Sequence, residues 1–280
     1  QGEVLDLVLA VEVPETASVN LTDKMTVEAA SWRFDYAKMI TDTTTANPTT
    51  GDRYVRPGGN DTQNNCIDPE AACESIEHAV LQTLPHDQIK IAQGTYAPTT
   101  TLLLNQNVAL LGGYTYNDGE FELPEEIDPS LTVLNFEGSR RGIRIIGSSV
   151  DSPVQGFTIR NASIDAPGGG IYVGLGAAPQ LRDLWLVDTQ GTDGGAIYVQ
   201  TGAPQLENVV ISGTHATGDG GALCNVGGTV TVDGLTVRGS TAEEEGGGIY
   251  NEGVLTLQNT FVISSVATAG GGVYNAGSLS

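Results

Sequence analysis

One phrase recurs five times along the chain: GGGIYV (168–173), GGAIYV (194–199), GGALCN (220–225), GGGIYN (246–251) and GGGVYN (270–275). The spacing between copies is constant except for a slightly shorter last interval. A second phrase fills each gap: VQGFTI (154–159), LRDLWL (181–186), LENVVI (206–211), VDGLTV (232–237) and LQNTFV (257–262). Its copies follow one another at nearly the same spacing. Two independent phrases that share one period indicate a repeat protein in which each repeat is one structural unit.

The phrases themselves indicate short strands that form a coil. Apolar residues alternate over short runs, as at Ile249 and Asn251 or at Leu255 and Leu257, which is typical of β-strands. The third position of the second phrase holds only Gly, Asp or Asn, the residues that adopt a left-handed backbone most readily. A bend is therefore expected at this position in every coil. The pattern predicts an all-β, single-stranded parallel β-helix with about 26 residues per coil.

Several stretches resemble known proteins. The phrasing GGGIYN…LTLQNT (246–260) and the GGAI form at 194–197 resemble the repeats of bacterial polymorphic outer-membrane proteins. They also resemble secreted right-handed β-helix proteins of pectate-lyase-like architecture. The segments at 54–80 and 87–98 resemble the opening segment of many such proteins. The resemblance covers about residues 53–280, and it implies a right-handed coil in an extracellular protein or one at the bacterial cell surface, associated with the outer membrane.

Three regions are expected from this reading. Residues 1–50 lie outside the repeat as a strand-rich extension, with strands at 4–13 and 24–34 and a Thr-rich linker that runs to about Thr50. Residues 51–86 are expected to form a cap with a short helix, and residues 87–280 the parallel β-helix with an acidic insertion at 116–130. The chain begins at Gln1, which fits either removal of a leader or a fragment of a longer protein.

The cap helix is expected directly after Asp68 and Pro69, with Asp68 as the N-cap and Pro69 in the first turn. Its apolar face would cover the open end of the first coil, and Pro85 would stop it. Cys66 and Cys73 lie close together in a polar stretch, so a disulfide in an exported protein and a pair of free thiols are both considered, with the disulfide favoured.

The charge of the chain argues against a nucleic acid as a partner, and its hydropathy argues against a membrane-spanning segment. The formal net charge of −22 leaves too few cations to neutralise the phosphates of a nucleic acid. No stretch approaches the length of about 18 apolar residues that a spanning helix needs, so no membrane span is expected.

Stacking places equivalent residues about 4.8 Å apart in neighbouring coils, so each position becomes a column. Asn225, Asn251 and Asn275 are expected inside, where their amides would form a hydrogen-bonded ladder. Tyr172, Tyr198, Tyr250 and Tyr274 are expected outside in one stripe, interrupted by Cys224 as a small, inert filler. The stripe is interpreted either as a surface for sugar rings or a partner, or as cross-coil packing.

Charged side chains offer two further groups. Asp193, Asp219 and Glu245 precede the glycine pair in successive coils and are either solvated turn residues or ligands of a shared Ca²⁺. No other cofactor is expected. Arg140, Arg141 and Arg144 form the one basic cluster, and in so acidic a chain internal ion pairing is predicted for it.

Two classes of function follow. The first is a non-enzymatic secreted or cell-surface protein: an adhesin, a surface-layer component or a fibre subunit that binds carbohydrate or a host or cell surface. Such a fibre would form by head-to-tail self-association, for which the segment at 4–13 could be lent as a strand. The alternative is a polysaccharide lyase or glycoside hydrolase, since the same coil carries both classes. No catalytic residues are assigned.

Overall fold

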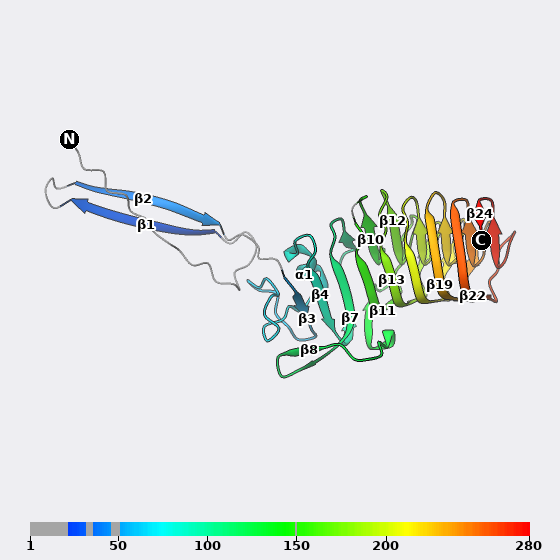
Figure 1. Cartoon of the computed structure of the whole chain (residues 1–280), viewed down its shortest axis with the longest axis horizontal. Helices are drawn as coiled ribbons and strands as arrows, with labels where there is room; N and C mark the ends of the chain where they lie inside the picture. Colours follow the sequence, from blue (N-terminus) through cyan, green and yellow to red (C-terminus); the bar gives the residue numbers. More distant parts are fainter. Residues whose placement is uncertain (1–21, 32–35, 46–50, 149) are drawn as a thin grey trace.

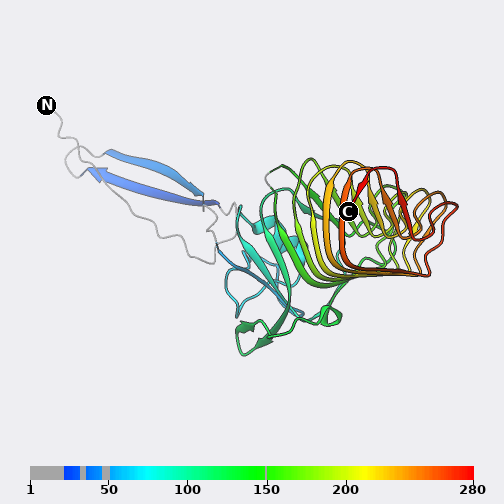
Figure 2. The same cartoon turned by 45° about the vertical axis from the view of Figure 1, so that its right-hand side comes forward.

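The computed structural model describes residues 22–31, 36–45, 51–148 and 150–280. The described residues from 51 to 280 form a parallel β-solenoid in which the chain winds through successive coils that stack along one axis (Figures 1 and 2). The described part contains one α-helix, α1 (Ile76–Gln82), and one short 3-10 helix, η1 (Pro129–Leu131). The predicted all-β parallel coil is confirmed.

One wall of the solenoid is a seven-stranded parallel sheet. From the C-terminal end its strands are β23 (Val273–Asn275), β21 (Ile249–Asn251), β18 (Leu223–Asn225), β15 (Ile197–Val199), β12 (Ile171–Gly174), β10 (Ile143–Ile146) and β6 (Leu102–Leu104). The five copies of the first phrase form the five strands β12, β15, β18, β21 and β23. Neighbouring strands pair at equivalent positions, as Ile171 does with Ile197. The period of the sequence is therefore one full coil.

The second wall is a twelve-stranded sheet. Its main path runs through β24 (Ser278–Leu279), β22 (Val254–Ile263), β19 (Thr229–Arg238), β16 (Gln205–Ser212), β13 (Gln180–Val187), β11 (Pro153–Arg160), β7 (Ala109–Asn117), β4 (Gln88–Ala92) and β3 (Arg53–Val55). Beside this path lie β5 (Gly94–Tyr96), β8 (Glu120–Glu122) and β9 (Thr132–Asn135). A third, three-stranded sheet consists of β14 (Gln190–Gly191), β17 (His215–Ala216) and β20 (Thr241–Ala242). Because β3 pairs with β4 in parallel, the sheet already begins within the segment 51–86.

The predicted bend is present in every regular coil. All five residues of the column have positive φ: Gly156 81°, Asp183 49°, Asn208 54°, Gly234 81° and Asn259 48°. Side chains normally alternate between the two faces of a strand, so inward residues are two positions apart. Across the bend, two successive inward residues are three positions apart. Leu181, Leu184 and Leu186 follow this spacing, and all three are fully buried.

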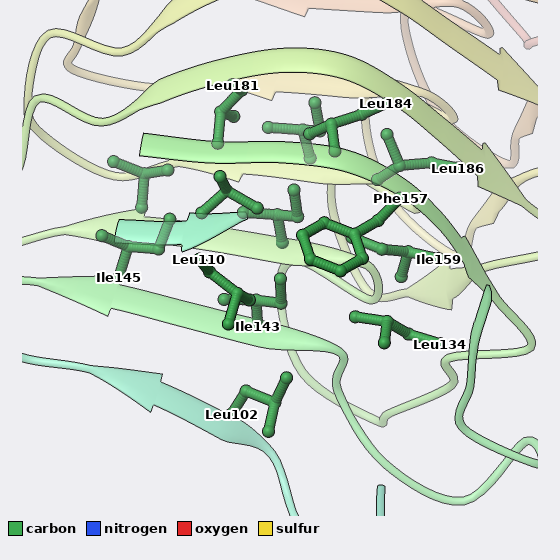
Figure 3. Close-up of a cluster of buried hydrophobic side chains, with 14 of the residues drawn as sticks. Leu102, Leu110, Leu134, Ile143, Ile145, Phe157, Ile159, Leu181, Leu184 and Leu186 are labelled. Atoms are coloured by element: carbon green, nitrogen blue, oxygen red, sulfur yellow. The ribbon is translucent and has the colours of Figure 1, made fainter. Parts of the chain in front are cut away.

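Aliphatic side chains from both walls fill the interior. Figure 3 shows Ile143 and Ile145 of β10 facing Phe157 and Ile159 of β11, and all four are fully buried. Each such side chain contributes about 1.5–3 kcal/mol when it leaves water, so the stacked core stabilises every coil against its neighbours. Leu257 also packs against this core, though it is only partly buried because it lies in the last coil.

The cap helix begins later than predicted. Ser75, not Asp68, is the N-cap, and its Oγ accepts a hydrogen bond from the backbone N–H of His78. Asp68 instead accepts from the backbone N–H of Glu70 in a local turn. The segment between them cannot be helical because Cys73 pairs in parallel with Val55 and so continues the sheet.

The acidic insertion contains a hairpin that the sequence analysis missed. β7 runs on beyond the coil and pairs with β8 in antiparallel fashion, from Thr115 opposite Glu122 to Asn117 opposite Glu120. Asp118 and Gly119 close the turn with φ of 46° and 93°. An Asp-Gly pair is a strong signal for such a turn.

The N-terminal extension contains two strands in the described residues. β1 (Thr22–Ser31) and β2 (Tyr36–Thr45) form a separate antiparallel sheet. β2 includes 41–45, which were predicted to belong to a Thr-rich linker; threonine is β-branched and favours strands. The strand predicted at 4–13 lies outside the described residues.

Candidate ligand-binding face

The outer face of the seven-stranded sheet carries one continuous column of side chains. Strand register aligns its members one per coil: Leu103, Arg144, Tyr172, Tyr198, Cys224, Tyr250 and Tyr274. We call this set the outer column. Its neighbours along each strand point inward, as Ile249 and Asn251 do on either side of Tyr250, and both of these are fully buried.

The tyrosines of the outer column stack on one another in pairs. Tyr172 and Tyr198 have ring centroids 5.6 Å apart with planes inclined by 22°, and Tyr250 and Tyr274 have centroids 5.6 Å apart with planes inclined by 1°. Each ring therefore has one face covered by its partner. The stacking shows that the tyrosines pack across coils, and the other interpretation made from the sequence, a surface for sugar rings or a partner, stays a prediction.

Tyr250 is more enclosed than the sequence implies. Its side chain lies on the outer face, yet only 8% of the residue is exposed, and its hydroxyl donates to Oε1 of Glu252 at 2.8 Å. Burial raises the pKa of the Tyr250 phenol, and burial likewise raises the pKa of Tyr198 to about 12. Both hydroxyls are therefore neutral donors at physiological pH.

Cys224 lies between the two stacked pairs and is only 1% exposed. It is a free thiol, and burial raises its pKa. A buried, protonated thiol is a poor nucleophile and metal ligand, which fits its interpretation as a small filler.

The acidic row is tied into the backbone of the solenoid. Oδ1 of Asp193 accepts the backbone N–H of Asp219 at 3.1 Å, and Oδ1 of Asp219 accepts that of Glu245 at 2.9 Å. Burial, together with the charges of Asp193, Glu244 and Glu245, raises the pKa of Asp219 although the Glu245 N–H opposes this. Each of these two aspartates thus links one coil to the next.

A shared Ca²⁺ would need the three carboxylates to converge. Within the described residues, only Cys66, Cys73 and His78 place three groups that could bind a metal within 4.8 Å of one another. Two of these are joined in a disulfide. Asp193, Asp219 and Glu245 are not among such groups; Oδ1 of each aspartate accepts a backbone N–H, and Oδ2 of Asp193 accepts the Thr192 hydroxyl at 3.2 Å.

The asparagines form a ladder inside the coil. Nδ2 of Asn225 donates to Oδ1 of Asn251, and Nδ2 of Asn251 donates to Oδ1 of Asn275, each at 2.7 Å. Asn225 and Asn251 are fully buried. The same amides also bond turn carbonyls, as Asn225 does with Gly228. The ladder satisfies buried polar groups where the chain leaves the strand.

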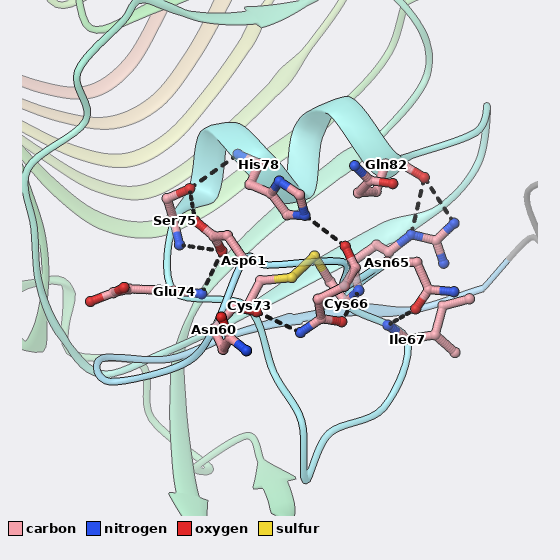
Figure 4. The surroundings of a disulfide bond; sticks show 12 residues. Asn60, Asp61, Asn65, Cys66, Ile67, Cys73, Glu74, Ser75, His78 and Gln82 are labelled. Atoms are coloured by element: carbon pink, nitrogen blue, oxygen red, sulfur yellow. Dashed lines mark hydrogen bonds between the residues drawn. A yellow bond between two sulfur atoms is a disulfide. The ribbon is translucent and has the colours of Figure 1, made fainter. Parts of the chain in front are cut away.

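The cap is held by a disulfide and by a network around one aspartate (Figure 4). Cys66 and Cys73 are joined in a disulfide. Beside it, Asp61 accepts from the backbone N–H of Glu74 at 2.8 Å and from the Ser75 hydroxyl at 2.6 Å. This network fixes the start of α1 over the first coil.

The arginine cluster does not form the predicted ion pairs. Nη1 of Arg140 donates to the Pro98 carbonyl at 2.7 Å, and Arg141 donates to the carbonyls of Pro167 and Gly168. Arg144 lies against the Tyr172 ring. The salt bridges found among the described residues include none of these three arginines.

Sequence reasoning missed that Arg144 belongs to the outer column. The signal was present, because IRII (143–146) aligns with IYVG (171–174) as strand residues of neighbouring coils. It was overlooked because the glycine phrase that marks the later repeats is absent before β10.

In the described part of the chain, no helix has the length and apolar character required to cross a membrane. Comparison of the chain with models of known families, with curated proteins and with solved structures finds no significant match in any of the three.

Proposed function

We propose that this protein is an exported, non-enzymatic β-solenoid that presents the outer column to a carbohydrate or to a partner at a cell surface, as an adhesin or a surface-layer component. The observation that carries the proposal is the outer column itself, which runs along all seven strands of one parallel sheet. Such a wall offers an extended contact surface, with phenol hydroxyls and ring edges that suit polar, hydroxyl-rich ligands.

Two further observations support this class. The carboxylates that could serve an enzyme are engaged in joining coils, as Asp183 is by Gln155 and Asn208 and as Asp193 is by the next coil. The Cys66–Cys73 disulfide is typical of oxidising compartments outside the cytosol. The resemblance of the glycine phrases to polymorphic outer-membrane proteins points to the same location.

The test is binding of the full chain to a glycan array and to intact cells. Tyr198→Ala removes a central member of the outer column and should weaken binding by about tenfold, since aromatic residues at interfaces often contribute about 1–2 kcal/mol or more. Trp185→Ala is the matched control, because Trp185 is an exposed aromatic residue (38%) on the other sheet.

Equal loss in both variants would contradict the role of this face. Release of reducing ends or unsaturated products from a panel of polysaccharides would instead favour the lyase or hydrolase alternative. Sedimentation of the same samples shows whether the chain also self-associates.

A further inference from the structure

Two arginines share one tyrosine ring at the N-terminal end of the stacked tyrosines. Cζ of Arg141 is 5.2 Å from the Tyr172 ring centroid, and Cζ of Arg144 is 5.5 Å from it. Nε of Arg141 donates to the Gly168 carbonyl at 2.9 Å and Nη2 to the Pro167 carbonyl at 2.7 Å, so this guanidinium is fixed in place.

Arg144 is different, because its guanidinium makes no hydrogen bond to any described residue and lies against the ring. Its side chain projects from β10 on the outer face, where it is half-buried. Its fork of N–H donors is therefore available to a ligand beside a fixed second guanidinium.

The pair is not neutralised, although the chain is rich in acids. Asp and Glu number 34 against 12 Lys and Arg, yet no described carboxylate forms a salt bridge with either arginine. Burial and then the charge of Arg144 lower the pKa of Arg141, which reflects two like charges held together. An anion placed between them would relieve this repulsion, and guanidinium groups match the geometry of carboxylate and sulfate oxygens.

We propose that Arg141 and Arg144 bind an oxyanion, a carboxylate or a sulfate, carried by an extracellular polysaccharide. This proposal specifies the chemical group that the outer column would bind, and it rests on the proposed function. The rest of the face favours a sparsely charged polymer, since Asp193, Asp219 and Glu252 lie along later coils and would repel a dense polyanion. Between its charges, such a polymer could place hydroxyls against the tyrosine edges.

The probes are hyaluronan, with carboxylates on alternate sugars, κ-carrageenan, with sulfates on alternate sugars, and agarose as a galactan without sulfate. We expect the full chain to bind one or both charged polymers in a salt-sensitive manner and to bind agarose much less. Arg144→Gln should weaken this binding about tenfold or more, because a charge-assisted hydrogen-bonded pair is lost. Arg144→Lys should be intermediate, since it keeps the charge and loses the planar fork.

Arg160→Gln is the matched control, because Arg160 is an exposed arginine of β11 and its loss changes the net charge equally. Unchanged thermal melting of each variant shows that the fold is retained. Binding to hyaluronan identifies the carboxylate, and binding to carrageenan identifies the sulfate.

Absence of binding to both charged polymers would overturn the site, as would equal weakening by Arg144→Gln and Arg160→Gln. If the chain binds a neutral glycan in a manner that depends on Tyr198 but not on Arg144, the oxyanion site fails while the proposed function stands.

Discussion

At Asn251 one carboxamide satisfies polar groups of three coils. Its Oδ1 accepts from Asn225, and its Nδ2 donates to Oδ1 of Asn275 and to the Ser278 carbonyl. We expect Asn251→Ala to lower the free energy of unfolding by about 1–3 kcal/mol, because the buried amide of Asn225 loses one of its acceptors and the Ser278 carbonyl loses a donor.

Urea unfolding checks this, with Asn275→Ala as the control. Asn275 holds the same position one coil further on, where it is exposed, so its truncation should cost clearly less. Equal costs for the two variants would mean that the ladder contributes through something other than burial.

Asp219 gives a prediction with a defined pH dependence. Its pKa in the folded protein is raised above the ordinary 3.8, chiefly by burial and then by neighbouring carboxylates. The protonated form is therefore favoured in the folded state, so stability from this group is present below pH 3.8 and is lost as the pH rises through the raised pKa. Asp219→Asn keeps an oxygen that can accept the Glu245 N–H and should raise the melting temperature at neutral pH.

The gain should shrink as the pH falls through the raised pKa toward 3.8. Melting curves from neutral pH down to below this value measure it, and Asp165→Asn, which removes an exposed carboxylate from the same chain, corrects for the change in net charge. An increase in melting temperature that is equal in both variants, or that persists unchanged in acid, would show that the charged form of Asp219 does not destabilise the folded state.

Single residues were predicted best where a column repeats. The asparagine column and the tyrosine column follow from the period alone, because a repeated strand must present the same position to the same side. The partners of Arg144 and the backbone contacts of Asp219 depend on distances between coils, which the pattern of residue types does not contain.

At the scale of elements, the bend within the second wall is the most specific feature. Asn208 is exposed and holds φ of 54°, and its Nδ2 donates to Asp183 at 3.2 Å. Asn208→Ala should cost about 1–2 kcal/mol, since alanine lacks the short polar side chain that lets asparagine adopt the left-handed backbone, and since the hydrogen bond to Asp183 is lost. Asn208→Gly should cost less, because glycine enters that region freely. The two free energies of unfolding, measured in urea, decide the point, and a larger cost for glycine than for alanine would refute the strained bend.

Elements inside the repeat were predictable, and elements outside it were not. The bend column was identified because five coils place Gly, Asp or Asn at one position. The β7–β8 hairpin occurs once, so no second copy drew attention to Asp118 and Gly119. The helix start was misplaced because Asp68-Pro69 is a good local signal, which the pairing of Cys73 with Val55 overrides.

At the scale of the whole molecule, the coils are equivalent units. From β11 to β23, each coil contributes one bent strand to the second wall and one strand to the first, and neighbouring coils pair in the same register. In such a stack the interactions are between nearest neighbours, so removal of one complete unit should leave the remaining interfaces intact. Removal of half a unit should place inward residues against outward ones.

Deletion of 220–245 tests whether the coils are equivalent units. It removes one complete repeat, joins Asp219 to Gly246 and sets β15 beside β21, so Tyr198 would stack on Tyr250. We expect the shortened chain to show a β-rich circular dichroism spectrum and one cooperative unfolding transition, with a slightly smaller dependence on denaturant. Deletion of 220–232, which removes half a repeat, should lower the melting temperature and broaden or split the transition, because the coils after the deletion no longer match those before it. Loss of folding when the complete repeat is deleted, or equal tolerance of both deletions, would contradict a solenoid built from equivalent coils.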